Sequence, residues 1–223
     1  MQPLRRKTGP SLALIVAGAT LASCAAPRPP VATRAAVIVE APPPERAWRS
    51  AVQPVDFDRL TRLGAAWDQA LAVARSAGAA RRVGAEGELL SPLAAQPRGA
   101  LPPGSYRCRL IRIGPGPRGR GSYTVNGPYF CFVGAEGVNP PLIQQTGPDR
   151  AWGSLYDDGD QRQIFVGARA RGAEKLLVNY GDRPERDVVG VVERVGNFRY
   201  RIVIPWPRSG AILEVLEMVP ATG

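Results

Sequence analysis

From residue 104 to residue 219 the sequence is a succession of short strand-like runs joined by turn residues, without helical patterns between them. Gly196-Asn197 and the Asp-Asp-Gly-Asp segment at 157–160 each separate two such runs, as tight turns do between antiparallel neighbours. Consecutive hairpins favour a sheet that curls or closes on itself. We therefore expect a mainly β fold, a small antiparallel barrel or curled sheet of about eight strands with a lipocalin-like outline.

The individual runs differ in pattern. Phe198, Tyr200, Ile202 and Ile204 alternate with more polar residues, which is typical of a strand with one buried face. The run at 175–180 is the weakest of the set. The expected strands cover residues 104–113, 129–133, 142–146, 152–156, 162–168, 175–180, 188–195, 198–205 and 212–219.

Two of these runs carry one cysteine each, Cys108 and Cys131. If the runs are antiparallel neighbours, Cys108 can lie opposite Cys131, close enough for a disulfide. Two free buried thiols are the alternative, because cysteine is readily accommodated in a core. The break in alternation at Leu110-Ile111 predicts a β-bulge there.

The N-terminus favours the disulfide. Residues 5–7 are basic, residues 11–21 are apolar but too few to span a bilayer, and residues 21–24 read Leu-Ala-Ser-Cys. This ending resembles the bacterial lipobox, which predicts a lipoprotein signal peptide at 1–23 and lipidation of Cys24; a signal peptide cut near Ala26 is the alternative. Because Ala25 is not aspartate, we expect an outer-membrane anchor on the periplasmic side, an oxidising compartment.

Residues 24–53 are rich in proline and alanine, which favours an extended tether. Residues 54–223 are then expected to form a single helix-plus-β-barrel domain. Its helix is predicted at 56–78, where Phe57, Leu60, Trp67 and Leu71 form an apolar stripe that suits packing on the sheet. Asp56 is the expected N-cap of this helix.

Composition excludes several chemistries. The chain has no histidine, which excludes Ser-His-Asp catalysis, Cys-His catalysis and the usual zinc sites. We expect no catalytic residue of these types, no metal and no cofactor. The formal net charge of +10 admits an acidic partner, but a periplasmic address excludes nucleic acid. The arginines at 107, 109, 199 and 201 fall opposite apolar strand positions and are expected to form an outer basic surface.

Several segments resemble a family of bacterial envelope proteins catalogued as domain of unknown function 4893. The resemblance covers most of residues 48–222 and implies one compact domain with a strand-borne cysteine pair, but no activity. Arg150 and Asp187 are charged residues within two of these segments. They are expected to form either a ligand site or a structural ion pair. The resembling segments are 103–109, 146–153, 164–167, 186–190 with 193–194, 201–205 and 213–220.

Three hypotheses for function follow. The first is a lipid-anchored periplasmic binding or interaction module, whose partner is an envelope protein, an envelope polymer or a small apolar ligand inside the barrel. The second is a carboxylate-dependent envelope hydrolase using Asp157 and Asp187. The third is a structural envelope lipoprotein. A cavity with two close carboxylates would favour the hydrolase, and a filled barrel interior would count against it.

Overall fold

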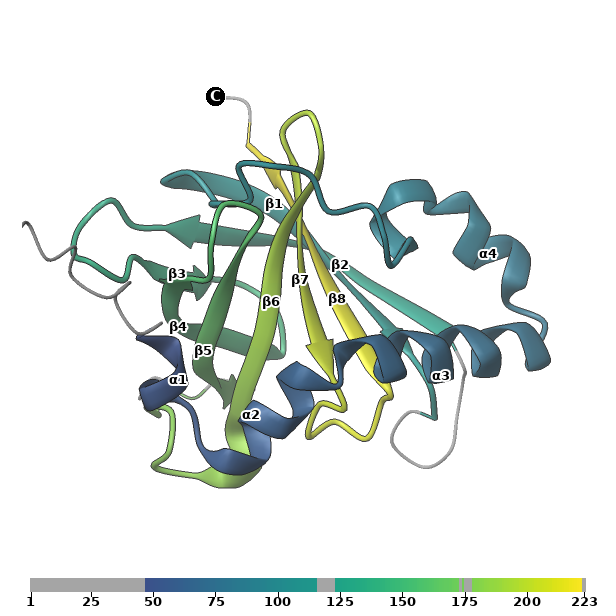
Figure 1. Cartoon of the computed structure of the whole chain (residues 1–223), viewed down its shortest axis with the longest axis horizontal. Coiled ribbons are helices and arrows are strands. Elements are labelled where there is room, and N and C mark those ends of the chain that lie inside the picture. Colours follow the sequence, from purple (N-terminus) through teal and green to yellow (C-terminus); the bar gives the residue numbers. More distant parts are fainter. Residues whose placement is uncertain (1–46, 116–122, 173, 175–177, 222–223) are drawn as a thin grey trace, which may run out of the picture. The chain divides into compact units, whose positions relative to one another are not determined.

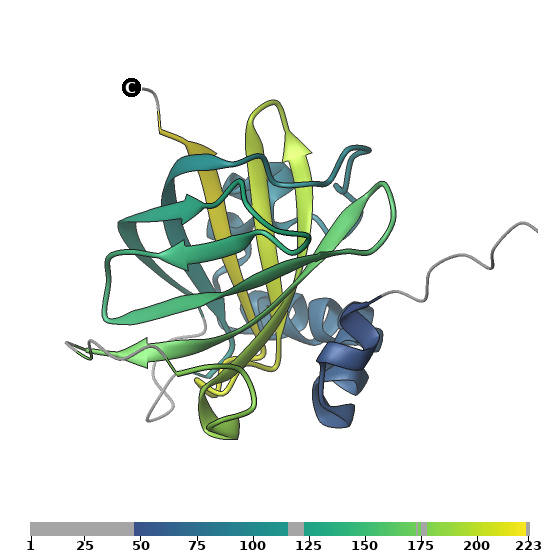
Figure 2. The same cartoon turned by 90° about the vertical axis from the view of Figure 1, so that its left-hand side faces the viewer.

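Eight antiparallel strands form a closed barrel in strict sequence order, and β1 pairs with β8 to complete the ring (Figures 1 and 2). The computed structural model describes residues 47–115, 123–172, 174 and 178–221. The predicted β class is therefore confirmed. The strands are β1 (Gly104–Ile113), β2 (Tyr123–Val133), β3 (Pro141–Gln144), β4 (Asp149–Asp157), β5 (Arg162–Arg171), β6 (Asp187–Gly196), β7 (Arg199–Pro205) and β8 (Leu213–Pro220).

Both turns singled out in the sequence join neighbouring strands. The 157–160 turn connects β4 to β5, and Gly159 adopts a φ of 89°, which glycine reaches without strain. Gly196 is the last residue of β6, and Asn197 follows it in the turn that leads to β7. The strand expected at 175–180 is absent where it can be judged, because residues 178–180 are irregular, and residues 175–177 lie outside the described residues.

The barrel interior is filled by side chains. Alternate residues of the strands point inward and form one hydrophobic cluster with bulky members such as Tyr106, Phe165 and Tyr200. Leu216 and Met218 complete it from β8. Because these side chains occupy the interior, the lipocalin-like outline does not extend to a hollow apolar centre.

The disulfide between Cys108 and Cys131 is confirmed, with the Cα atoms 6.2 Å apart. Its register differs from expectation, because Tyr106 lies opposite Cys131 and Cys108 lies opposite Tyr129. The two cysteines are therefore diagonal neighbours on the inward face. The irregularity that shifts this register lies between Cys108 and Leu110 of β1, where Arg109 alone faces two residues of β2, and not at Leu110-Ile111 as predicted.

The predicted helix at 56–78 is two helices, α2 (Pro54–Thr61) and α3 (Leu63–Ser76), separated at Arg62. Gln53 is the N-cap and proline occupies the first turn, so the expected cap at Asp56 was wrong. Two short helices flank this pair, α1 (Trp48–Ala51) and α4 (Ala80–Ala85). Short 3-10 helices follow at η1 (Gly87–Leu90) and η3 (Pro184–Arg186).

The helices cover part of the outer face of the barrel (Figure 1). Trp67 and the alanines of α3 pack on outward residues of β1, β7 and β8, among them Ile111 and Val203. Trp48 and Leu60 pack on outward residues of β5 and β6. The described structure thus begins at Ala47, inside the segment expected to be tether. Among the described residues, helices of the length and apolarity needed to cross a membrane are absent.

Candidate functional site

A charged pocket of about 270 Å³ opens at the end of the barrel where β1 and β5 end and where β4, β6 and β8 begin. We call it the barrel-mouth pocket. Residues from four strands, from the 3-10 helix η3 and from the loop between β7 and β8 line it, and arginine is the commonest type. The lining residues are Arg112, Asp149, Arg169, Arg171, Glu185, Arg186, Asp187, Val188, Arg208 and Ser209.

The strands deliver these charges because the inward pattern of each strand changes from apolar to charged near the mouth. Along β1 the inward residues Cys108 and Leu110 belong to the core cluster, and the next inward position is Arg112. Arg169 holds the corresponding place on β5 and Glu214 on β8. The apolar interior therefore ends in a polar layer.

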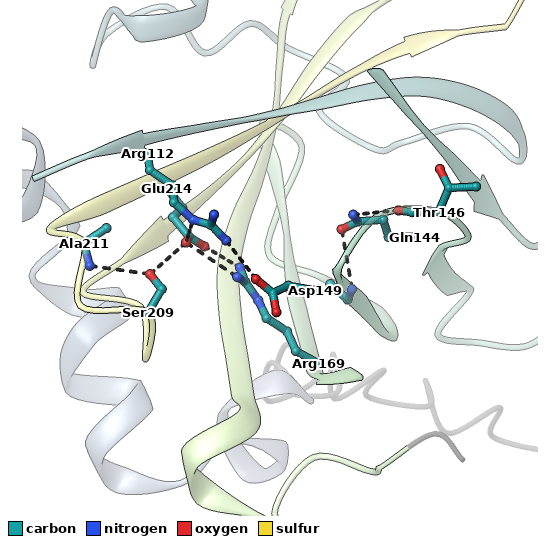
Figure 3. A network of polar contacts seen from close by, with 9 residues as sticks. Arg112, Gln144, Thr146, Asp149, Arg169, Ser209, Ala211 and Glu214 are labelled. Carbon is teal, nitrogen blue, oxygen red and sulfur yellow. Dashed lines mark hydrogen bonds and ion pairs between the residues drawn. The ribbon is translucent and has the colours of Figure 1, made fainter. Parts of the chain in front are cut away.

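Glu214 is the centre of this layer (Figure 3). Its side chain is fully buried and accepts a hydrogen bond of 2.6 Å from Arg112 Nε. Arg169 Nη2 forms an ion pair with the other carboxylate oxygen. Ser209 Oγ, from the loop between β7 and β8, donates a third bond of 2.8 Å. One carboxylate thus holds two guanidinium groups side by side.

The electrostatics of Glu214 follow from these partners. Burial alone would raise the pKa of its carboxyl group, but the charges and hydrogen bonds of Arg169 and Arg112 outweigh burial and lower the pKa below its usual range. Glu214 is therefore ionised at neutral pH. Since it offsets one of the two arginine charges, the three groups together keep a charge of about +1.

Asp149 lies on the rim of the pocket, on the other side of Arg112 (Figure 3). Arg112 Nη2 is 3.3 Å from its carboxylate, and the side chain is 41% exposed, so this contact is looser than the one to Glu214. The loop before Asp149 is ordered by Gln144, whose amide donates to Thr146 O at 3.0 Å. Asp149 is therefore an accessible carboxylate in a fixed place.

The pocket wall also contains polar atoms without partners. Among the described residues, four buried side-chain polar atoms make no hydrogen bond, and three of them belong to lining residues: Arg169 Nε, Arg186 Nε and Asp187 Oδ2. A buried polar group left without a partner costs about 1–3 kcal/mol. Such costs are concentrated here, as they are at many functional sites.

Arg186, the last residue of η3, and Asp187, the first residue of β6, form another part of the wall. Asp187 Oδ1 accepts a bond of 2.9 Å from Gly181 N, and burial, followed by the nearby charge of Asp56, raises the pKa of its carboxyl group. Arg186 is held by Glu174, to which it donates from both terminal nitrogens. This hydrogen bonding lowers the pKa of Glu174 to about 2.

Comparison with known proteins gives one result. A family model described as domain of unknown function (DUF4893) matches residues 48–218. The chain belongs to this family. Searches of the curated proteins and of the solved structures found no match. The resemblance noted in the sequence is thus confirmed, and the DUF4893 match begins at Trp48, the first residue of α1.

In this DUF4893 protein the two charges singled out by that resemblance are not partners. Arg150 donates to the carbonyl oxygens of Gly172 and Glu174, at 2.5 and 2.6 Å, and so ties β4 to the segment after β5. Asp187 has the separate partner described above. Within the described residues no ion pair joins Arg150 to Asp187. Of these two residues, only Asp187 lines the barrel-mouth pocket.

The carboxylates considered for hydrolysis are also separated. Asp157 pairs with Gln163 at one end of β5, whereas Asp187 pairs with Ala168 near the other end. At the rise of a strand this separation is roughly 16 Å, too far for two carboxyl groups acting on one bond. In the described part of the chain, groups of three or more His, Cys, Asp or Glu that could hold a metal are absent.

The expected basic surface was wrong in part. Arg107 is exposed, but Arg201 is 0% exposed, beneath α3 and η1, where its guanidinium lies 5.0 Å from the ring centre of Trp67. Arg109 and Arg199 both pair with Glu217. Most of the positive charge that strand alternation assigned to solvent is therefore either buried beneath helices or paired with carboxylates.

Sequence reasoning did not identify the residues that form the pocket, apart from Asp187. Arg112 lies two residues after Leu110 and continues the inward positions Tyr106, Cys108 and Leu110, but the bulge expected at Leu110-Ile111 concealed this. An arginine at an inward position needs a buried counter-charge or an opening. The proposed lipidation site, Cys24, lies outside the described residues.

Proposed function

We propose that this DUF4893 protein is a lipid-anchored binding module on the periplasmic side of the envelope, and that it binds a small ligand through an anionic group in the barrel-mouth pocket. The observation that carries the binding proposal is the presence of five arginines around one accessible pocket. Arginine suits this role because its planar fork matches carboxylate and phosphate oxygens.

The filled interior supports a site at the mouth over one inside the barrel. A small apolar ligand would need to displace bulky inward side chains, among them Phe165 and Tyr200. At the mouth, by contrast, charged groups already lie at the surface of a pocket. Arg171 is the most available of them, because it is exposed and has no ion-pair partner among the described residues.

The test measures binding of acetate and inorganic phosphate to the full chain in detergent micelles by isothermal titration calorimetry. We expect Arg171→Gln to weaken binding at least tenfold, since a hydrogen bond to a charged group contributes about 1.5–3 kcal/mol. Arg107→Gln is the matched control, because Arg107 is exposed at the opposite end of β1. Binding also weakens as salt rises. Equal affinities in the two variants, or no binding of either anion, would contradict the proposal.

A structural role in the envelope is the second candidate, and one observation favours it. Phe130 and Phe132 on the outer face of β2 are 54% and 39% exposed, and Val219 of β8 is also exposed. Aromatic residues are enriched at protein interfaces. Crosslinking in cells, followed by purification, tests this role: loss of a crosslinked partner in a Phe130→Ser, Phe132→Ser variant supports it, and an unchanged crosslinking pattern contradicts it.

A further inference from the structure

We propose that the ligand of the barrel-mouth pocket is zwitterionic, a free amino acid or a similarly sized group that carries an amino group beside its carboxylate. This inference rests on the proposed binding function and adds the chemical class of the ligand. It follows from the balance of charge around the pocket, from the position of the acidic residues and from the volume of the pocket.

The positive charge of the pocket is largely balanced by the protein itself. Glu214 pairs with both Arg112 and Arg169. Arg186 pairs with Glu174. Arg208 lies 3.6 Å from Asp56, a loose contact. The positive charges that remain are that of Arg171 and the charge of about +1 shared by Arg112, Arg169 and Glu214, which we call the Glu214 group. Together they supply less positive charge than a multiply charged anion such as phosphate would need.

Accessible negative charge lies on the same rim. Asp149 is partly exposed and has one long contact, to Arg112, and Glu185 is exposed. Two carboxylates at the rim weaken the binding of a ligand that is purely anionic. They attract one whose cationic group lies a few ångströms from its anionic group, because each charge then meets its opposite.

The buried atoms of the wall that make no hydrogen bond also include both donors and acceptors. Arg169 Nε and Arg186 Nε are donors, whereas Asp187 Oδ2 is an acceptor when ionised. These atoms lie below the pocket surface, so they indicate the polarity of the wall and are not themselves assigned as ligand contacts. A wall that contains both donors and acceptors suits a ligand that offers both acceptors and donors.

The volume limits the size of the ligand. About 270 Å³ is below the range of roughly 300–1,000 Å³ typical of sites for drug-sized molecules. A single amino acid fits, and so does the end of a longer molecule that projects into solvent. Arg171, with Arg112 and Arg169 beyond it, would then receive the carboxylate, and Asp149 with Glu185 would receive the amino group.

The experiment compares three probes of similar size on the full chain in micelles by isothermal titration calorimetry: alanine, N-acetylalanine and isopropylamine. N-Acetylalanine keeps the carboxylate without the positive charge, and isopropylamine keeps the amine without the carboxylate. We expect alanine to bind at least tenfold more tightly than either. Asp149→Asn and Glu185→Gln should each reduce this preference for alanine, whereas Asp160→Asn, an exposed acidic residue at the opposite end of the barrel, should leave it unchanged.

If isopropylamine binds as tightly as alanine, the carboxylate contributes nothing to binding, and both the proposed function and the zwitterion inference are overturned. If N-acetylalanine binds as tightly as alanine and Arg171→Gln weakens both, the pocket is an anion site, and the zwitterion inference is overturned while the proposed function stands. If alanine binds best but neither acidic variant reduces its preference, the assignment of the rim carboxylates is overturned. If none of the three probes binds, both proposals fail. Circular dichroism of each variant confirms that the fold is retained.

Discussion

Trp48 Nε1 donates a hydrogen bond of 2.8 Å to Asp158 Oδ1, across 110 residues of chain, and both residues are buried. Arg162 Nε donates to the other oxygen of the same carboxylate at 2.6 Å. The acidic turn between β4 and β5 therefore holds the start of the folded domain against the barrel. Asp158 thus serves as a hydrogen-bond acceptor within the protein.

Removing this bond should destabilise the domain without disturbing its shape. Trp48→Phe keeps an aromatic ring beside Phe57 but leaves the buried Asp158 with one donor fewer. We expect the free energy of unfolding to fall by about 1–3 kcal/mol, the usual cost of a lost buried partner. Urea denaturation measures it, with Asp160→Asn as the control. A change no larger than that of the control would show that the bond contributes nothing.

Glu214 should make the stability of the barrel depend on acid. Its folded pKa is lowered from 4.5, so its contribution is fully present above about pH 4.5 and is lost as the pH falls towards the folded pKa. We expect the unfolding free energy of the wild-type protein to decrease over that interval, and Glu214→Gln to be less stable at pH 7 but flatter in acid. Parallel pH profiles for the two proteins would contradict this.

A milder variant keeps the test informative if Glu214→Gln does not fold. Ser209→Ala removes one of the hydrogen bonds to the carboxylate but leaves both arginines in place. We expect it to lower the unfolding free energy at pH 7 by about 0.5–1.5 kcal/mol. The same urea titrations, repeated at acidic pH, give both this value and the dependence of the unfolding free energy on pH.

Arg201 should be the most sensitive arginine of the outer face. It is enclosed by Glu193, Trp67 and three carbonyl oxygens of the segment around η1. Arg201→Ala leaves Glu193 buried and unpaired, so we expect a loss of about 3–5 kcal/mol in unfolding free energy. Arg107→Ala, at an exposed position two strands away, should change it by less than about 0.5 kcal/mol. Thermal and urea denaturation distinguish the two.

The proposed anchor makes a separate prediction in cells. If Cys24 is lipidated, Cys24→Ser should move the mature protein from the membrane fraction to the soluble periplasmic fraction or leave the precursor uncleaved. Mass spectrometry of the wild-type N-terminus should show the added acyl mass. Cys108→Ser serves as the control, because it removes a cysteine from the barrel and not from the N-terminal segment. An unmodified N-terminus together with unchanged fractionation would rule out the anchor.

Strand alternation predicted which faces are inward but not which residues lie opposite each other. Cys108 was placed correctly on the buried side, because the period of two assigns faces, whereas the run at 129–133 is apolar on both faces and assigned none to Cys131. A shift of two residues keeps every side chain on its face, so alternation could not distinguish the direct pairing expected from the diagonal pairing observed.

Arg201 shows a second limit of the same reasoning. Alternation assigned it to solvent because it lies opposite apolar positions, and it does point out of the barrel. The outer face is itself covered there by α3 and η1, and on β7 only the apolar Val203, two residues further along, hints at that cover. Tertiary contacts between distant segments therefore decided its burial.

Predicting the pocket requires knowing that the strands close into a ring. Arg112, Arg169 and Glu214 lie more than 40 residues from one another in sequence, and their positions become equivalent only when β1, β5 and β8 are placed around one axis. A single strand shows a charge at an inward position but not the charge that balances it. The barrel could be predicted from the hairpins, whereas the Glu214 group could not.

The pairing of β1 with β8 also governs when the domain can form. Residues 213–220 complete two seams at once, one with β7 and one with a strand that begins more than 100 residues earlier. A nascent or translocating chain that still holds these residues in a channel has two open edges, which are prone to intermolecular association. Ring closure therefore cannot precede the release of residues 213–220, and a stop codon shortly before residue 213 should yield a chain that depends on chaperones or is degraded.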